Sequence, residues 1–253
     1  MSAIINSIHA EFLKLKRTLS PWLCFLAPAI SVTLGAFVVF GGVMNAAEGG
    51  EAQWKIYCEI IFSVWTKFIL PAYITLQLAL MLGIENNGRQ WKQLMSLPLH
   101  RGVHYFSKLA CAFFLIGISN LIVICLIPAS GFIVSIYDDS LLGSISHMPV
   151  SYAVLTAIKI TVGSLFLISL QSYISFKSLN YNLAIGVGFV AIAFCIFLPG
   201  KDLWIIQYIP WNMPGTLVKV WGDEAITIMV VGVVGFLIFL LAGMKSFVTR
   251  EWG

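Results

Sequence analysis

Long apolar runs dominate the chain, and short polar stretches separate them. A helix needs about 20 apolar residues to cross the hydrocarbon core of a bilayer. Six stretches approach or exceed this length, near residues 22–44, 60–83, 109–136, 152–176, 183–199 and 225–244, and the fifth is the shortest. Because the runs lack the period-two alternation of barrel strands, they predict six transmembrane helices in an all-α integral membrane protein, with one transmembrane domain over residues 1–253.

The composition supports this assignment. The chain is 59% hydrophobic and only 10% charged, whereas about 25% of the residues of a soluble domain are charged. A soluble protein of this size cannot bury so much apolar surface, so the excess must face a lipid bilayer. The five cysteines contain no Cys-x-x-Cys pair, which favours packing residues over a disulfide framework.

Basic residues are unevenly divided between the two sides of the predicted spans. With a cytoplasmic N-terminus, the inner side carries ten of the fifteen lysine and arginine residues, and the outer loops carry Lys55, Lys201 and Lys219. The other two, Lys67 and Lys159, fall within spans. This division follows the positive-inside rule and predicts that both termini are cytoplasmic. The net charge of +4 therefore reflects membrane topology, and no nucleic-acid partner is expected.

The first 20 residues predict an amphipathic helix on the inner membrane surface. At about 100° per residue, six apolar side chains share an arc of about 100°, namely Ile4, Ile5, Ile8, Phe12, Leu15 and Leu19. Lys14, Lys16 and Arg17 give the helix the basic character of a helix held at the lipid headgroups. Such a helix is either a juxtamembrane anchor or an anchor that also contacts a cytoplasmic partner.

The longest cytoplasmic segment, residues 85–108, predicts an elbow of two short helices. The first would begin after Asn86 or Asn87 and end at Pro98. Its apolar face carries Trp91, Leu94 and Met95, and off that face lie Arg89, Lys92 and Gln93. A second helix is expected from about Arg101 into the third span. The exposed aromatic face favours a docking surface, and the alternative is a basic loop that only sets the topology.

The outer stretch of residues 199–224 is too polar to span a membrane and too apolar for a free loop. It contains Trp204, Tyr208, Trp211 and Trp221, aromatic residues that favour the membrane–water interface. Pro210 and Pro214 would interrupt any helix through it. The stretch therefore predicts two short re-entrant or interfacial helices before the last span.

Motifs for catalysis are missing from the sequence. It has no G-x-x-x-x-G-K-[ST] phosphate loop, so we expect no ATPase site and no enzymatic activity in this chain. His100 and His104 lack a third ligand, and no metal site is predicted.

Five polar side chains lie within spans: Lys67, Gln77, Asn120, Lys159 and Gln171. The first four are candidates for a transport pathway. Glutamine and asparagine in spans usually form hydrogen bonds between helices. Each lysine would either snorkel to the outer headgroups or line an outward-facing cavity.

The cytoplasmic elbow resembles a known family. A glutamate at the end of the second span, a glycine three residues later, an aromatic helix, Leu-Pro-x-x-Arg and a lysine before the third span follow in order, here Glu85, Gly88, Trp91, Leu97-Pro98, Arg101 and Lys108. This order resembles the permease subunits of type-2 ABC exporters, and especially the small permeases that include the lantibiotic-immunity subfamily. The stretches Glu11-x-x-Lys14-x-Lys16-Arg17 and Ile209-Pro210…Pro214 are similar to the same family.

The resemblance implies a permease subunit in the bacterial cytoplasmic membrane. Such subunits export a peptide, an antibiotic or another amphipathic substrate, in some cases for self-immunity or resistance. It further implies a second permease chain, identical or related, and two separate ABC ATPase subunits that hold ATP and Mg²⁺, so no cofactor is expected in this chain. It makes the elbow a coupling helix that contacts the ATPase through Glu85, Gly88, Arg89, Trp91, Lys92, Leu94, Pro98 and Arg101.

Two other readings remain open from the sequence. One is a membrane anchor or sensor subunit that transports nothing. The other is a secondary carrier, but carriers usually show internal repeats and buried ionisable sites, and neither is evident here. A phosphate-loop protein encoded beside this chain would favour the exporter.

Overall fold

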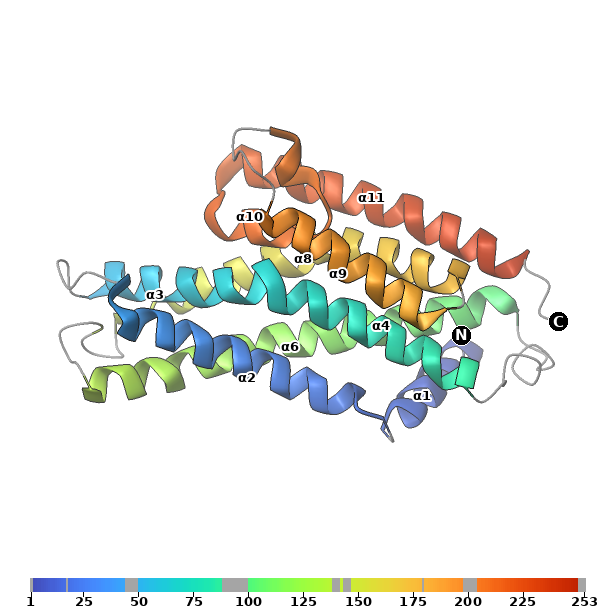
Figure 1. Cartoon of the computed structure of the whole chain (residues 1–253), viewed down its shortest axis with the longest axis horizontal. Coiled ribbons are helices and arrows are strands. Elements are labelled where there is room, and N and C mark those ends of the chain that lie inside the picture. The colour runs from blue at the N-terminus through green and yellow to red at the C-terminus, as the bar shows by residue number, and fades with distance from the viewer. Residues whose placement is uncertain are drawn as a thin grey trace.

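The computed structural model describes residues 2–16, 18–43, 50–87, 100–137, 142, 147–178, 180–197 and 204–249. Within these ranges every regular element is a helix. Figure 1 shows the long helices side by side in one elongated bundle. The first helix and the last turn of the final helix lie at one end, here named the terminal end, and the opposite end is named the distal end.

The chain begins with a short helix, α1 (Ser2–Leu15), and continues after a break into α2 (Ser20–Val38), which a π-helical turn extends over Val39–Val43. The Leu15 carbonyl accepts hydrogen bonds from the Thr18 backbone N–H and hydroxyl at 2.9 and 2.7 Å. Pro21 then lies in the first turn of α2, where proline favours the start of a helix. The predicted surface helix is therefore shorter than residues 1–20 and excludes Leu19.

The second long helix runs from Glu51 to Asn87 through α3 (Glu51–Val64), the π-helical turn η2 (Trp65–Ile69) and α4 (Leu70–Asn87). At the end of η2 the Leu70 N–H bonds to the Trp65 carbonyl. Pro71 follows directly and has no N–H to donate, so a regular α-helical ladder cannot pass this point, and the wider turn accommodates the break.

The remaining long helices are α6 (Arg101–Tyr137), α8 (Val150–Ser178) and α11 (Gly222–Val248). By length and composition five stretches could cross a membrane: Ser20–Gly41, Glu51–Met81, Arg101–Tyr137, Val150–Ser178 and Gly222–Val248. The fifth predicted span corresponds to α9 (Tyr181–Phe197), which is apolar but has 17 residues, a length of about 25 Å. The structure thus supports five candidate spans, and a sixth at α9 stays a prediction.

Two short helices occupy the outer stretch between α9 and α11. These are η4 (Trp204–Tyr208), a 3₁₀ helix, and α10 (Met213–Lys219). Pro214 lies in the first turn of α10, and four of its seven residues are buried. α10 packs against α8 and α3, so the chain folds back into the bundle before α11 begins.

The core of the bundle is built around α8, which packs against α11, α6, α10, α4 and α9. Small residues permit the closest approaches. A side chain at Gly235 of α11 would put its Cβ 2.7 Å from the Phe166 ring of α8, and a Cβ at Gly188 of α9 would collide with Thr75 of α4. The sequence shows small residues at these positions, but only the packing shows which ones lie in contacts between helices.

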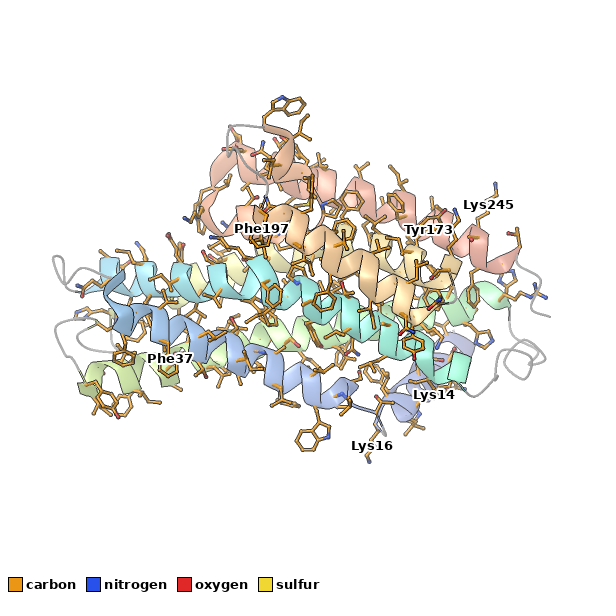
Figure 2. All side chains as sticks on the ribbon, in the orientation of Figure 1. Lys14, Lys16, Phe37, Tyr173, Phe197 and Lys245 are labelled. Atoms are coloured by element: carbon orange, nitrogen blue, oxygen red, sulfur yellow. The ribbon has the colours of Figure 1, made fainter. Side chains whose placement is uncertain are left out.

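The outer surface of the bundle is strongly apolar. Figure 2 shows side chains projecting outward along its length, among them Phe37, which is 67% exposed, and Phe197, which is 80% exposed. The labelled Lys14, Lys16 and Lys245 gather toward the terminal end. An apolar lateral surface with basic residues at one end is the pattern expected of a bundle embedded in a bilayer.

Candidate functional site

The predicted coupling segment is attached at the terminal end. α4 ends at Asn87 and α6 begins at Arg101, close to α1 and to the last turn of α11. Glu85 lies in the last turn of α4, and its side chain falls outside the described part of the structure. The other predicted coupling residues between the two helices also lie outside the described part, namely Gly88, Arg89, Trp91, Lys92, Leu94 and Pro98. Their coupling role stays a prediction.

Arg101 ties the start of α6 to the end of α11. Its Nη1 donates a hydrogen bond to the Val248 carbonyl at 3.1 Å. Val248 is the last residue of α11, where backbone carbonyls have no partner within the helix. Beside it, the His100 imidazole Nδ1 accepts from the Gly102 N–H at 3.1 Å and caps α6. The predicted coupling segment is therefore followed by a junction of two long helices.

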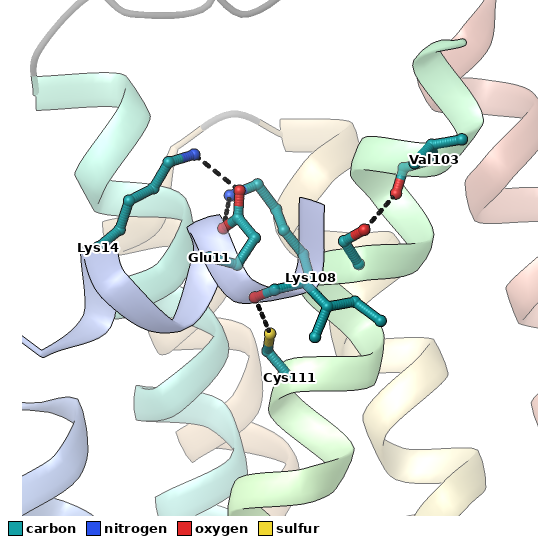
Figure 3. Close-up of polar contacts among 7 residues, drawn as sticks. Glu11, Lys14, Val103, Lys108 and Cys111 are labelled. Carbon is teal, nitrogen blue, oxygen red and sulfur yellow. Dashed lines mark hydrogen bonds and ion pairs between the residues drawn. The ribbon is translucent and has the colours of Figure 1, made fainter. Parts of the chain in front are cut away.

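A buried ionic cluster fixes α1 to α6 at the same end. Figure 3 shows Glu11 between Lys108 and Lys14, with Lys108 Nζ 2.7 Å from Oε2 and Lys14 Nζ 2.7 Å from Oε1. The side chains of Lys108 and Glu11 are 1% and 4% exposed, and that of Lys14 is 27% exposed. We name Glu11, Lys14 and Lys108 the ionic cluster.

The electrostatics of the ionic cluster favour the ionised carboxylate. Burial by itself raises the pKa of Glu11, but the charges of Lys108 and Lys14 and their hydrogen bonds outweigh it and hold that pKa below its ordinary value. Glu11 therefore carries its negative charge at neutral pH and compensates the buried Lys108. A buried lysine without such a partner would be strongly unfavourable.

Further contacts complete the docking of α1. The Cys111 thiol of α6 lies 3.7 Å from the Ile8 carbonyl and donates to it (Figure 3), and the Phe12 and Phe114 rings meet edge to face with centroids 5.3 Å apart. The exposed residues of α1 include Ile4 and Ile5 of the predicted apolar stripe.

α1 thus differs from the predicted helix with one apolar face. The side of α1 that packs against α6 is partly polar, because Glu11 on it pairs with Lys108. Its buried face carries Ser7 and Glu11 together with Leu15. Of the predicted basic residues, Lys14 joins the ionic cluster and Lys16 is exposed, whereas Arg17 lies outside the described residues.

Two of the predicted pathway residues make contacts between helices. The Asn120 side chain on α6 accepts from Trp65 Nε1 on η2 and donates to Thr161 Oγ1 on α8, both at 2.8 Å. The Gln77 amide on α4 donates to the Ser20 hydroxyl at the start of α2. All four of Trp65, Asn120, Gln77 and Ser20 are buried within this chain, which favours the role of joining helices.

The two lysines within spans have different environments. Lys159 is 7% exposed, and its Nζ donates to the Val220 carbonyl at 3.0 Å and lies 3.3 Å from the centre of the Trp221 ring. The loop between α10 and α11 thus provides a carbonyl and an aromatic face for its charge. Lys67, in η2, is exposed instead. The sequence places both lysines at similar depth, and only the folded-back loop distinguishes them.

The described residues form no metal-binding site. They contain no group of three histidine, cysteine, aspartate or glutamate side chains placed to hold a metal ion. Within the same ranges all five cysteines are free thiols.

Sequence reasoning missed the partners that make these sites. Trp65 and Thr161 bind Asn120 from two other helices, and nothing in their local sequence indicates this. Glu11 and Lys108 are each a charged residue beside apolar ones, which marks both as unusual in the sequence. Their pairing could not be predicted, because 97 positions separate them.

The comparison with protein families agrees with this architecture. Residues 7–195 match the model described as ABC-2 family transporter protein. This match covers well over half of the chain, and the chain therefore belongs to the ABC-2 transporter family. It is a multi-pass membrane protein and a permease component, whose family works with an ABC ATPase. The comparison with curated individual proteins gives no significant match.

Proposed function

We propose that this chain is the permease subunit of an ATP-driven exporter that moves a peptide, an antibiotic or another amphipathic substrate out of the cell or the membrane. A role in self-immunity or resistance would follow from such a substrate. Two ABC ATPase subunits would supply ATP hydrolysis, with ATP and Mg²⁺ bound there, and a second permease chain, identical or related, would complete the pathway. Family membership supports the permease role, and the sequence resemblance supports the direction and the substrate class.

The proposed orientation places the terminal end in the cytoplasm of a bacterial cell, with both termini inside and six spans including α9. The distribution of charge supports it. Lys14, Lys16 and Lys245 lie toward the terminal end (Figure 2), whereas Asp223 and Glu224 begin α11 at its other end. Basic residues favour the cytoplasmic side of membrane proteins.

One structural relationship carries the coupling proposal. The segment between Asn87 and Arg101 leaves α4 and enters α6 at a junction that the ionic cluster joins to α1 and that Arg101 joins to α11. If an ATPase moved this segment, the movement would be transmitted to α4 and α6 directly, and to α1 and α11 through these contacts. In the proposal Trp91 is the anchor buried in the ATPase groove, and Glu85 and Arg101 set the orientation.

The test is truncation of the anchor. Trp91→Ala should weaken ATPase binding by ~2 kcal/mol or more, since large aromatic residues dominate such contacts. The measurements are co-purification of the ATPase in mild detergent with identification by mass spectrometry, stimulation of ATP hydrolysis, and export. The matched control is Trp204→Ala, which removes an exposed tryptophan from η4, in the stretch between α9 and α11.

Arg101→Glu is a second test of the same surface, but it also removes the bond to Val248, so its folded level in the membrane must be measured alongside. Lys245→Glu makes the same charge change nearby and serves as its control. If Trp91→Ala and Arg101→Glu both keep wild-type ATPase stimulation and export, the docking proposal is wrong. If no ATPase co-purifies with the wild-type chain, that result favours an anchor or sensor subunit.

A further inference from the structure

A lateral pocket lies toward the distal half of the bundle, between α2, the α3–η2 helix and the end of α10. Its volume is about 470 Å³, within the range of small-molecule sites. Leu34 and Val38 of α2 and Ile60 and Phe68 of the facing helix contribute its apolar walls. We name this space the lateral pocket.

Three charged side chains line the same pocket. Lys67 comes from η2, Lys219 from the last residue of α10, and Glu59 from α3. The stem of Lys67 runs beside α10, because its Cγ lies 3.8 Å from the position of a Cβ on Gly215. Two lysine side chains from elements far apart in the sequence therefore line one largely apolar space.

The charges of the lateral pocket are not balanced. Within the described part of the chain, neither Lys67 nor Lys219 makes an ion pair or a side-chain hydrogen bond, and Glu59 accepts from the Tyr152 hydroxyl at 2.9 Å. Two positive groups thus face one carboxylate that already has a donor. Lys159 shows the contrast, since its ammonium contacts the Val220 carbonyl and the Trp221 ring within the fold. An anionic group would complement this excess of positive charge.

We propose that the lateral pocket binds an anionic phospholipid from the outer half of the bilayer. Its phosphate would lie between Lys67 and Lys219, and an acyl chain would follow the apolar wall of α2 and α3. Ile56 and Phe68 of the pocket lining are themselves exposed, so the pocket opens on the apolar surface that a membrane protein presents to lipid. The position of Lys219 just before α11, whose first turn carries Asp223 and Glu224, matches the level of headgroups.

The experiment measures lipid retention by the purified chain, without any ATPase, so that its outcome is independent of the transport proposal. Native mass spectrometry and thermal unfolding in mild detergent are recorded with phosphatidylglycerol or phosphatidylcholine of the same acyl chains. The wild type should bind phosphatidylglycerol more tightly. Lys67→Gln combined with Lys219→Gln should weaken phosphatidylglycerol binding about 30-fold, since each basic group near an anionic headgroup contributes a factor of about five.

Two single variants separate charge from shape. Lys55→Gln removes an outer basic residue that pairs with Glu51 outside the pocket, and it should leave the preference unchanged. Ser63→Trp fills the pocket without changing its charge and should reduce binding of both lipids. Equal retention of the two lipids by the wild type, or an unchanged preference in the double lysine variant, would overturn the proposal. Equal stabilisation by glycerol 3-phosphate would also overturn it, since the site would then require only a phosphate.

Discussion

Lys108 and Glu11 form an ion pair at 2.7 Å, although 97 positions separate them and both side chains are almost completely buried. The pair joins α1 to α6 about two helical turns from Arg101, the first residue of α6 after the predicted coupling segment. Moving two charges out of water costs free energy that their attraction only partly returns. The main effect of this pair is therefore to fix the position of α1 against α6, since the buried charges meet only when the two helices are correctly placed.

Removal of one partner of this pair should destabilise the protein strongly. Glu11→Gln removes the carboxylate that lies 2.7 Å from the buried Lys108 ammonium, at a cost of about 3–5 kcal/mol. Thermal unfolding in mild detergent measures the change, and Lys14→Gln, at the partly exposed edge of the cluster, should cost about 1 kcal/mol or less.

Replacement of both partners provides the control for that prediction. Glu11→Leu with Lys108→Met exchanges the pair for apolar side chains and should recover much of the lost stability. If Glu11→Gln unfolds at the wild-type temperature, the buried pair is not what holds α1 to α6.

The same pair predicts a dependence of stability on pH. The folded-state pKa of Glu11 lies below its ordinary value, which is about 4.3. The contribution of this carboxylate is therefore fully present above that ordinary value and is lost as the pH falls through the lowered pKa. The difference in unfolding temperature between wild type and Glu11→Gln should stay constant from pH ~7 to ~5 and shrink below pH ~4. A difference that widens on acidification would contradict the assigned direction.

The hydrogen bonds of Asn120 predict a second pattern of destabilisation and recovery. Asn120→Leu leaves the buried Trp65 N–H without its acceptor, at a cost of about 1–3 kcal/mol. Asn120→Leu with Trp65→Phe removes donor and acceptor together and should restore most of that stability. Export by the stable double variant then reports on function: wild-type export assigns Asn120 to helix packing, and loss of export assigns it to the pathway.

The contact of Gly243 with Tyr105 predicts a steric effect at the terminal end. A Cβ on Gly243 of α11 would collide with the Tyr105 hydroxyl of α6. Gly243→Ala should therefore cost about 1–3 kcal/mol, the range for overpacking a filled interior. Gly186→Ala is the matched control, because no atom lies within 4 Å of its Cβ position, and it should not destabilise α9.

A compensating variant tests the cause of that loss. Tyr105→Phe removes the hydroxyl that the new methyl group meets, so adding it to Gly243→Ala should return part of the lost unfolding temperature. An equal loss with and without the hydroxyl would show that the strain arises elsewhere in the contact between α6 and α11.

Much of the helical architecture could be predicted because apolar length is a local property. The runs near residues 109–136, 152–176 and 225–244 each lie within a single long helix. The start of the second helix could not be predicted, since Glu51, Gln53 and Lys55 interrupt the apolar residues of this stretch. Trp54 and Tyr57 of this stretch are nevertheless buried, and Gly131 of α6 leaves the space that the Trp54 ring fills.

The sequence by itself determined that the chain is a helical membrane protein, where its long helices lie and that basic residues favour one side, because hydrophobicity and charge act residue by residue. The tertiary structure alone decided the partner of each polar side chain. Lys67 and Lys159 have similar places in their predicted spans, yet one lines a lateral pocket and the other meets Val220 and Trp221. The difference arises because the loop after α10 supplies a carbonyl and an aromatic ring to Lys159. The cost of a buried charge depends on the groups that distant parts of the chain place beside it.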